Sequence, residues 1–167
     1  MFFNRRMILP RRVLGLIALT SVLLLVFGLY LQHIVGLEPC PMCIVQRYAL
    51  VLVAVMAGLF ALSRKPSVLL TGLLLLVLTS GFGAFVAARQ SWLQWYPPEV
   101  ASCGRDFYGM IETFPLKRLL PMIFKGSGDC SAVDWTFLGG SIANWSFAWF
   151  SFAALVALTL LVRQARR

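Results

Sequence analysis

The chain is poor in charged residues and poorest in acids. Only 13% of its 167 residues are charged, and 6 acidic residues face 15 lysines and arginines. It also has a single histidine. Hydrophobic residues, in contrast to charged ones, make up 60% of the chain. A soluble domain of this length has roughly twice the share of charged residues. The composition therefore excludes a soluble globular domain and indicates an integral membrane protein.

Internal repeats and low-complexity linkers are also absent. The hydrophobic residues are instead grouped in long segments, which we interpret as membrane spans. Four segments have close to the roughly 20 residues that cross a hydrocarbon core of about 30 Å. We expect an all-α fold, an integral membrane four-helix bundle that forms a single domain over residues 1–167. The four spans are residues 13–31, 44–62, 68–88 and 145–162, the two tails are 1–12 and 163–167, and the two loops are 32–43 and 89–144.

The excess positive charge is confined to one side of these spans. Nine bases and no acid lie in the tails and in the turn between the second and third spans, whereas all six acids lie in the two loops. By the positive-inside rule, the basic side is cytoplasmic and the loops face outward. The net charge of +9 therefore indicates topology, and we expect a lipid bilayer and no nucleic acid as a partner. The nine bases are Arg5, Arg6, Arg11, Arg12, Arg64, Lys65, Arg163, Arg166 and Arg167.

All four cysteines lie in the outward loops, on the side where disulfides persist. Cys40 and Cys43 form a Cys-x-x-Cys pair in the first loop, and Cys103 and Cys130 lie in the second. Four cysteines allow three pairings, and the sequence alone does not choose among them. The short spacing makes Cys40–Cys43 the natural local pair, which leaves Cys103 to Cys130.

Three roles are open to these cysteines. A structural staple explains the Cys-x-x-Cys pair weakly, because closing so short a loop gains little chain entropy. Zinc binding by the four thiols is conceivable, but no second cluster of ligands supports it. Thiol–disulfide exchange is the favoured role.

Prolines on both sides of Cys40 shape the start of the second span. Pro39 and Pro41 each fix φ and bias the preceding residue away from the helix, so Cys40 is expected in an extended turn. Cys43 then falls in the first helical turn, where unpaired N–H groups and the helix dipole favour a thiolate. The pair is therefore predicted to be redox active at the membrane edge.

Arg47 and His33 flank this pair, and each has an alternative role. Arg47 is at i+4 from Cys43, on the same helix face, and its charge suits a thiolate or a reduced oxygen-bearing cofactor. Alternatively, Arg47 only snorkels to the interface, about one helical turn away. His33 is typical of a hydrogen-bonded interfacial residue, although imidazole can also shuttle protons near neutral pH.

The second outward loop and the third span carry further signals. Residues 111–124 combine an amphipathic pattern with two prolines, which favours a short helix in the membrane interface. Residues 126–130 favour a flexible hinge that lets Cys130 change partners, and Cys103 is expected to be exposed. In the third span, glycines at 72, 81 and 83 are expected to allow close helix approach.

Taken in order, these motifs resemble the DsbB family, bacterial inner-membrane proteins of disulfide bond formation. The resemblance covers nearly the whole chain and rests on the joint order, spacing and placement of the motifs on four spans. Known members carry a histidine shortly after the third span, where this chain has Gln90, so no role of that histidine is carried over. The motifs are Gln32-His33, Pro39-Cys40-x-x-Cys43-Ile44-x-x-Arg47, Tyr96-Pro97, Ser127-Gly128-Asp129-Cys130 and Trp135-x-Phe137-Leu138-Gly139.

The resemblance implies a disulfide-generating oxidoreductase that reoxidises DsbA, a soluble periplasmic thioredoxin-like oxidase. Its cofactor is then membrane quinone, either ubiquinone or menaquinone. The implied order begins with attack by the partner's thiolate on Cys103 of a Cys103–Cys130 disulfide. Cys130 then attacks Cys40, which frees Cys43 beside the quinone, with Arg47 stabilising negative charge. DsbA is a strong oxidant, so its regeneration requires coupling to quinone rather than to a thiol buffer.

Two alternatives to this function remain open at the level of the sequence. One is a specialised paralogue that serves a dedicated partner. The other is a non-catalytic membrane scaffold whose disulfides only hold its loops.

Overall fold

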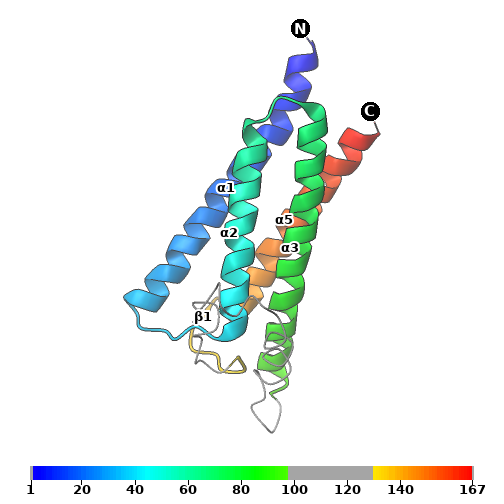
Figure 1. Cartoon of the computed structure of the whole chain (residues 1–167). Coiled ribbons are helices and arrows are strands. Elements are labelled where there is room, and N and C mark those ends of the chain that lie inside the picture. The colour runs from blue at the N-terminus through cyan, green and yellow to red at the C-terminus, as the bar shows by residue number, and fades with distance from the viewer. Residues whose placement is uncertain (1, 98–129, 167) are drawn as a thin grey trace, which may run out of the picture.

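Four long helices make up most of the computed structural model, which describes residues 2–97 and 130–166 (Figure 1). All four are long and apolar enough to cross a membrane. The prediction of an all-α, multi-pass membrane bundle is therefore confirmed. The elements are α1 (Phe2–His33), α2 (Pro41–Leu62), α3 (Pro66–Trp95), β1 (Thr136–Phe137), β2 (Gly140–Ser141) and α5 (Ile142–Ala165).

Parts of the second loop lie outside the described residues. These parts include Cys103 and the interfacial helix predicted for residues 111–124. The division of the chain into one membrane domain with two tails and two loops stays a prediction.

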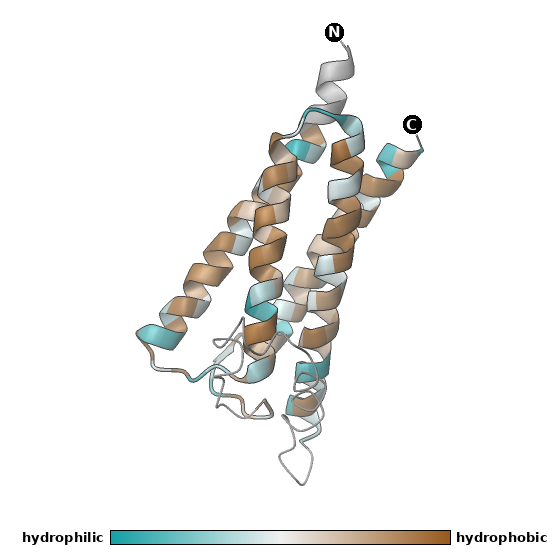
Figure 2. Cartoon of the chain, in the orientation of Figure 1, coloured by the Kyte–Doolittle hydropathy of each residue, from teal (hydrophilic) through white to brown (hydrophobic). Residues whose placement is uncertain are grey.

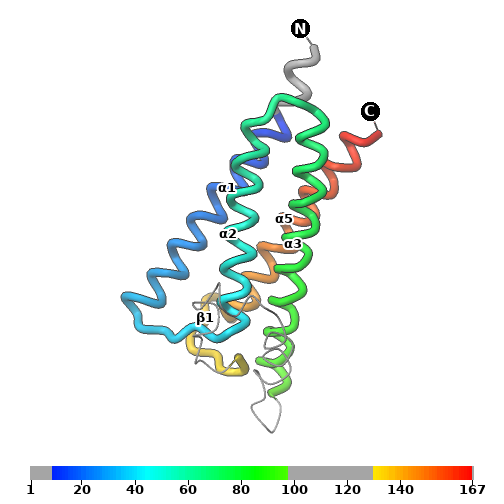
Figure 3. The backbone as a smooth tube through the Cα atoms, in the orientation of Figure 1, coloured from blue at the N-terminus to red at the C-terminus, as the bar shows by residue number. Residues whose placement is uncertain are grey.

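The helices are arranged so that α3 packs against both α2 and α5, while α1 packs against α2 (Figure 3). Helix α1 approaches α2 near the turn at residues 63–65 and slants away from it toward His33 (Figure 1). Helix α3 is thus held between α2 and α5, whereas the end of α1 that leads to His33 lies farther from α2.

Small residues explain the close packing of α3. A Cβ atom on Gly83 would lie 2.6 Å from the ring of Phe150 on α5, and Gly72 faces the ring of Phe60 on α2 in the same way. Both glycines therefore allow close helix approach, as predicted. The prediction is wrong for Gly81, which has no atom within 4 Å of its Cβ position and faces away from the other helices.

The outer faces of the helices are apolar and exposed, as expected for lipid contact. Figure 2 shows hydrophobic residues along the length of each helix and hydrophilic residues near the ends. In a bilayer, helices satisfy their own backbone hydrogen bonds, so apolar side chains can face the lipid directly. Side chains of this kind include Leu16, Leu59, Leu78, Phe85 and Leu155.

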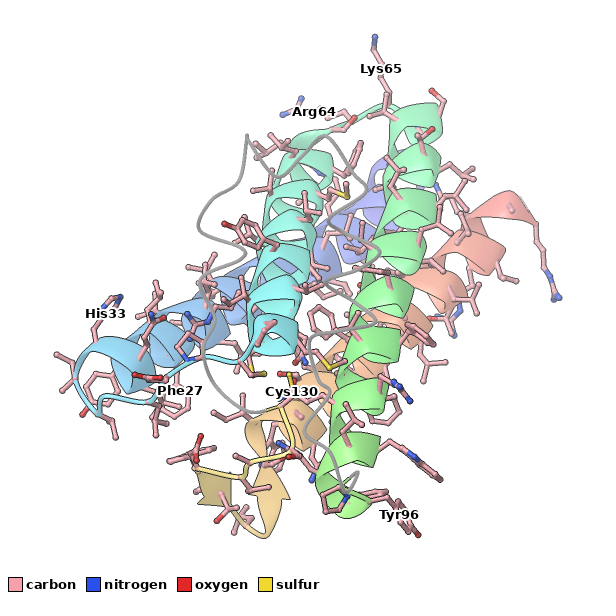
Figure 4. All side chains as sticks on the ribbon, turned by 60° about the horizontal axis from the view of Figure 1, so that its bottom comes forward. Phe27, His33, Arg64, Lys65, Tyr96 and Cys130 are labelled. Atoms are coloured by element: carbon pink, nitrogen blue, oxygen red, sulfur yellow. The ribbon has the colours of Figure 1, made fainter. Side chains whose placement is uncertain are left out.

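The two ends of the bundle differ in chemistry. Arg64 and Lys65 lie at one end, and His33, Tyr96 and Cys130 lie at the other (Figure 4). At the basic end, Nε of Arg11 also donates to the carbonyl oxygen of Ala61 at 2.8 Å, which ties α1 to the last turn of α2.

Candidate functional site

Helix α2 begins at the Cys-x-x-Cys pair, and a cysteine sulfur caps it. Cys40 has an extended backbone (φ −75°, ψ 160°), and its Sγ accepts a hydrogen bond from the N–H of Cys43 at 3.2 Å. Pro41 follows in the first turn, where a missing N–H leaves no helical bond unmade. Cys40 thus lies in the predicted extended turn, and Cys43 in the predicted first helical turn.

Three cysteines meet at this helix end. Cys40 and Cys43 are thiols, and the Sγ of Cys40 donates to the Sγ of Cys43 at 2.8 Å. Cys130 is fully buried in the same apolar cluster as Cys40, and Figure 4 places it between the ends of α2 and α3. A hydrogen bond with Cys130, one with Cys43, and burial together raise the pKa of the Cys40 thiol. Cys40 therefore stays protonated at neutral pH.

Two buried glutamines from different helices complete the cluster. Nε2 of Gln90 on α3 donates to the Sγ of Cys43 at 3.1 Å and to the Sγ of Cys40 at 3.3 Å. Oε1 of Gln90 accepts from Nε2 of Gln46 on α2 at 2.6 Å. We call Cys40, Cys43, Gln46 and Gln90 the amide–thiol cluster.

Sequence reasoning missed Gln46 and used Gln90 only as a departure from the resembling family. Gln46 lies three residues after Cys43 within an apolar span, and Gln90 lies near the end of α3. Polar groups within a span are costly to bury unless they are bonded. That polar character was the signal for both residues, although it does not say which partner they bond.

Arg47 points toward α1. One guanidinium nitrogen donates to Oε1 of Gln32, and the other donates to the carbonyl oxygen of Gly28 at 3.2 Å. We call these three residues the arginine brace. The guanidinium thus finds its hydrogen-bond partners on α1, inside the bundle, although Arg47 and Cys43 share a face of α2 as predicted.

A cavity of about 750 Å³ connects the brace and the amide–thiol cluster. It lies between α1, α2, α5, the last turns of α3 and the segment that follows Cys130. In that segment, Trp135 packs edge-on against Phe27 of α1, with ring centroids 5.7 Å apart. Small-molecule sites typically have about 300–1,000 Å³ and mostly apolar walls with a few polar groups. The apolar lining includes Leu24, Leu31, Leu50, Phe152 and Trp149, and the polar lining includes Cys43, Gln46, Arg47, Gln90 and Gln94.

Gln94, one turn beyond Gln90 on α3, fixes the segment that carries Cys130. Its Nε2 donates to the carbonyl oxygen of Ala132 at 3.3 Å. Its Oε1 accepts from Oγ of Ser141, the N-cap of α5, at 2.6 Å. Gln94 thus holds the chain to α3 at two points, one before the β1–β2 hairpin at Ala132 and one at its end at Ser141.

The remaining candidates from the sequence are not part of this cluster. His33 is exposed at the end of α1, away from Cys130 (Figure 4). Cys103 lies outside the described residues. Within residues 2–97 and 130–166, no group of three or more His, Cys, Asp or Glu side chains is arranged to hold a metal ion.

The comparisons with known proteins all indicate the same family. Residues 10–160 match the family described as "Disulfide bond formation protein DsbB". The chain is 74% identical over 159 residues to "Disulfide bond formation protein B" of Polaromonas sp. (strain JS666 / ATCC BAA-500), with 95% of each chain covered. It is 73% identical over 158 residues to the protein of that name from Polaromonas naphthalenivorans (strain CJ2), again with 95% of each covered. A third protein of that name, from Aromatoleum aromaticum, is 53% identical over 154 residues, which are 90% of this chain and 91% of that protein.

Proposed function

This chain belongs to the DsbB family of disulfide bond formation proteins, and we propose that it reoxidises DsbA, a periplasmic thioredoxin-like dithiol oxidase, and passes the electrons to membrane quinone. The family name supports a disulfide-forming oxidoreductase in a membrane. The identity of the partner and of the electron acceptor is our proposal.

The observation that carries the proposal is the position of Cys40 between two other cysteines. Its Sγ contacts the Sγ of Cys43 on one side, and it shares a buried cluster with Cys130 on the other. A sulfur so placed can exchange one disulfide partner for the other with little movement. This supports a relay in which Cys130 attacks Cys40 and displaces Cys43.

The relay balances in two exchanges. In the first, the dithiol of DsbA becomes a disulfide, and a Cys103–Cys130 disulfide is reduced to two thiols. In the second, Cys130 attacks Cys40 of a Cys40–Cys43 disulfide, Cys103 closes the bond to Cys130 again, and Cys40 and Cys43 are left as the dithiol. Each exchange forms one S–S bond, breaks one, and moves two electrons toward the membrane.

The cavity beside Cys43 fits a quinone headgroup in size and lining. Its walls are mostly apolar, and Arg47, Gln46 and Gln90 bring polar groups to the side nearest the sulfurs. When bound there, quinone supplies a two-electron, two-proton acceptor for the dithiol of Cys40 and Cys43. Both Cys40 and Cys43 line the cavity. Cys43 is the more exposed of the two, which makes it the thiol that we assign to the quinone side.

The charge distribution supports an orientation with both termini in the cytoplasm and the cysteines in the periplasm of a bacterial inner membrane. Arg64 and Lys65 lie at the end of the bundle opposite to Cys130 (Figure 4). Basic residues remain on the cytoplasmic side during insertion. The cysteines then lie on the oxidising side, where DsbA is found.

The test is a reconstituted reaction. Purified protein in lipid nanodiscs is given reduced DsbA and either ubiquinone or menaquinone, and quinone reduction is followed by absorbance. We expect reduction at a rate proportional to the amount of protein and its loss in Cys43→Ser. Wild-type protein that reduces neither quinone, or a Cys43→Ser variant with unchanged turnover, would refute the proposal.

A further inference from the structure

Gln90 is the only described side chain besides the cysteines that hydrogen-bonds to both sulfurs of the Cys-x-x-Cys pair. We infer that Gln90, oriented by Gln46, is a thiolate-binding residue of the redox centre and holds the sulfur of Cys43 in place after the Cys40–Cys43 disulfide is reduced. The inference rests on the proposed redox role of these two cysteines.

The amide of Gln90 can serve both protonation states of Cys43. Its Nε2 lies 3.1 Å from Sγ, where it donates to a thiolate. Its Oε1 lies 3.6 Å from the same sulfur, where it accepts from a thiol. A side chain that offers a donor and an acceptor to one sulfur keeps a partner for that sulfur before and after the proton leaves.

Gln46 determines which end of the amide faces the sulfurs. Its Nε2 donates to Oε1 of Gln90 at 2.6 Å, so the Nε2 group of Gln90 is directed toward Cys40 and Cys43. Both glutamines are buried, with 5% and 3% of their surfaces exposed. An amide in such a place is costly unless its groups are bonded, and here the sulfurs take the two donated bonds.

The charged groups nearby do not replace this neutral donor. Cys40 contacts Cys43, and Cys130 contacts Cys40, but a thiol has no donor other than S–H. Arg47, Glu38 and Asp134 line the same cavity, but the guanidinium of Arg47 is bonded to oxygens on α1. The amide also does not titrate, so its hydrogen bond to the thiolate persists across the physiological pH range.

A purely structural role for Gln90 is the alternative. Two buried glutamines can hold α2 against α3 through their mutual bond alone, and the contact with sulfur is then incidental. The alternatives differ in what happens to the reactivity of Cys43 when the amide is replaced and the fold is kept.

The test measures how fast Cys43 reacts with iodoacetamide as a function of pH. Reduced full-length protein in nanodiscs is alkylated from pH 5 to 10, and tandem mass spectrometry assigns the modified sulfur. In Gln90→Leu, we expect the rate at Cys43 at neutral pH to fall about ten- to a hundredfold, because a hydrogen bond to a charged group is lost. The rate should recover at high pH, where the thiol ionises without help.

Two further variants sharpen the test. Gln90→Glu should slow alkylation at least as much as Gln90→Leu, because a carboxylate cannot donate and repels a thiolate. Ser91→Ala is the matched control, since Ser91 is the buried residue next to Gln90 on α3 and its hydroxyl has no hydrogen-bond partner among the described residues. Its pH profile for Cys43 should match that of the wild type.

Thermal unfolding of each variant identifies loss of fold. If Gln90→Leu does not fold, Gln90→Asn retains an amide that is one methylene too short, and it is expected to show the same slowing. A folded variant at position 90 with the wild-type pH profile would overturn the inference. That result would leave the proposed function standing if wild-type protein still reduces quinone, so failure of the inference and failure of the function are distinguishable.

Discussion

The two sides of α2 are built differently. On the side of α3, Gly72 lets the ring of Phe60 on α2 pack closely, and Gln90 contacts the sulfurs directly. On the side of α1, the helices separate toward the cysteine end, and Arg47 reaches across to Gln32 beside a cavity. The close side fixes the positions of the reacting sulfurs, whereas the open side leaves room for a ligand beside them.

The largest effect is expected from Cys130, which lies on the close side. Cys130→Ser should abolish turnover, because Cys103 then has no disulfide to exchange and no thiol passes electrons on to Cys40. Given oxidised DsbA, the Cys103 thiolate of the variant should attack the DsbA disulfide, release one DsbA thiolate and form a mixed disulfide. Cys40 and Cys43 should still form their own disulfide, as read by thiol labelling. Non-reducing electrophoresis and mass spectrometry identify the mixed disulfide, and a partner attached to Cys43 would contradict this order of transfer.

Arg47 tests the open side. In Arg47→Gln, we expect quinone turnover to weaken about ten- to a hundredfold through loss of a charged donor, while exchange between DsbA and the pair of Cys103 and Cys130 continues. Lysine should rescue in part, because it keeps the charge and loses the planar fork. Steady-state kinetics with varied quinone, at equal amounts of folded protein, gives KM and kcat, and unchanged values for both would remove Arg47 from the site.

Gly83 and Gly81 test how closely α3, the helix of the close side, is packed against α5. A methyl group at Gly83 would meet the ring of Phe150, whereas the same group at Gly81 meets nothing within 4 Å. Gly83→Ala should therefore destabilise the bundle by about 1–3 kcal/mol, the usual cost of overpacking. Gly81→Ala should be neutral or slightly stabilising. Equal unfolding curves for the two variants in detergent would show that α3 and α5 can separate without cost.

Gln32 separates two contributions of Arg47 and is expected to have the smallest effect. Gln32→Leu removes one acceptor of the brace and leaves the guanidinium charge in place. We expect quinone KM to rise two- to tenfold, the range for one hydrogen bond of about 0.5–1.5 kcal/mol. A loss as large as that of Arg47→Gln would mean that Arg47 acts by bracing α1 and not by its charge.

Much of the architecture could be predicted from the sequence. Each of the four apolar runs is long enough to span a bilayer, and such helices follow from the need to satisfy backbone groups in lipid. The start of α2 was equally accessible, because Pro39 and Pro41 constrain the backbone of Cys40 locally. These two features depend on only a few neighbouring residues, and both were predicted correctly.

Features that depend on a neighbouring helix were not. Gln46 and Arg47 are adjacent in the sequence, yet one bonds to α3 and the other to α1. The face that each residue occupies is fixed by the helical period, but the helix that covers that face is fixed by the packing of the bundle. The same reason explains Gly81, which is as small as Gly83 and faces no neighbour.

The sulfur cap of α2 has a further consequence. Since Sγ of Cys40 is the acceptor for the N–H of Cys43, any change in the bonding of that sulfur also changes the end of the helix. In the reduced pair, Sγ of Cys40 is a thiol that donates to Sγ of Cys43 while it accepts from the N–H of that residue. In a Cys40–Cys43 disulfide, the S–H donor is gone and the two sulfurs are joined by a bond. Electron transfer through Cys40 is thus accompanied by local loosening and tightening of the first turn, and amide hydrogen exchange at Cys43 should report the redox state of its neighbour.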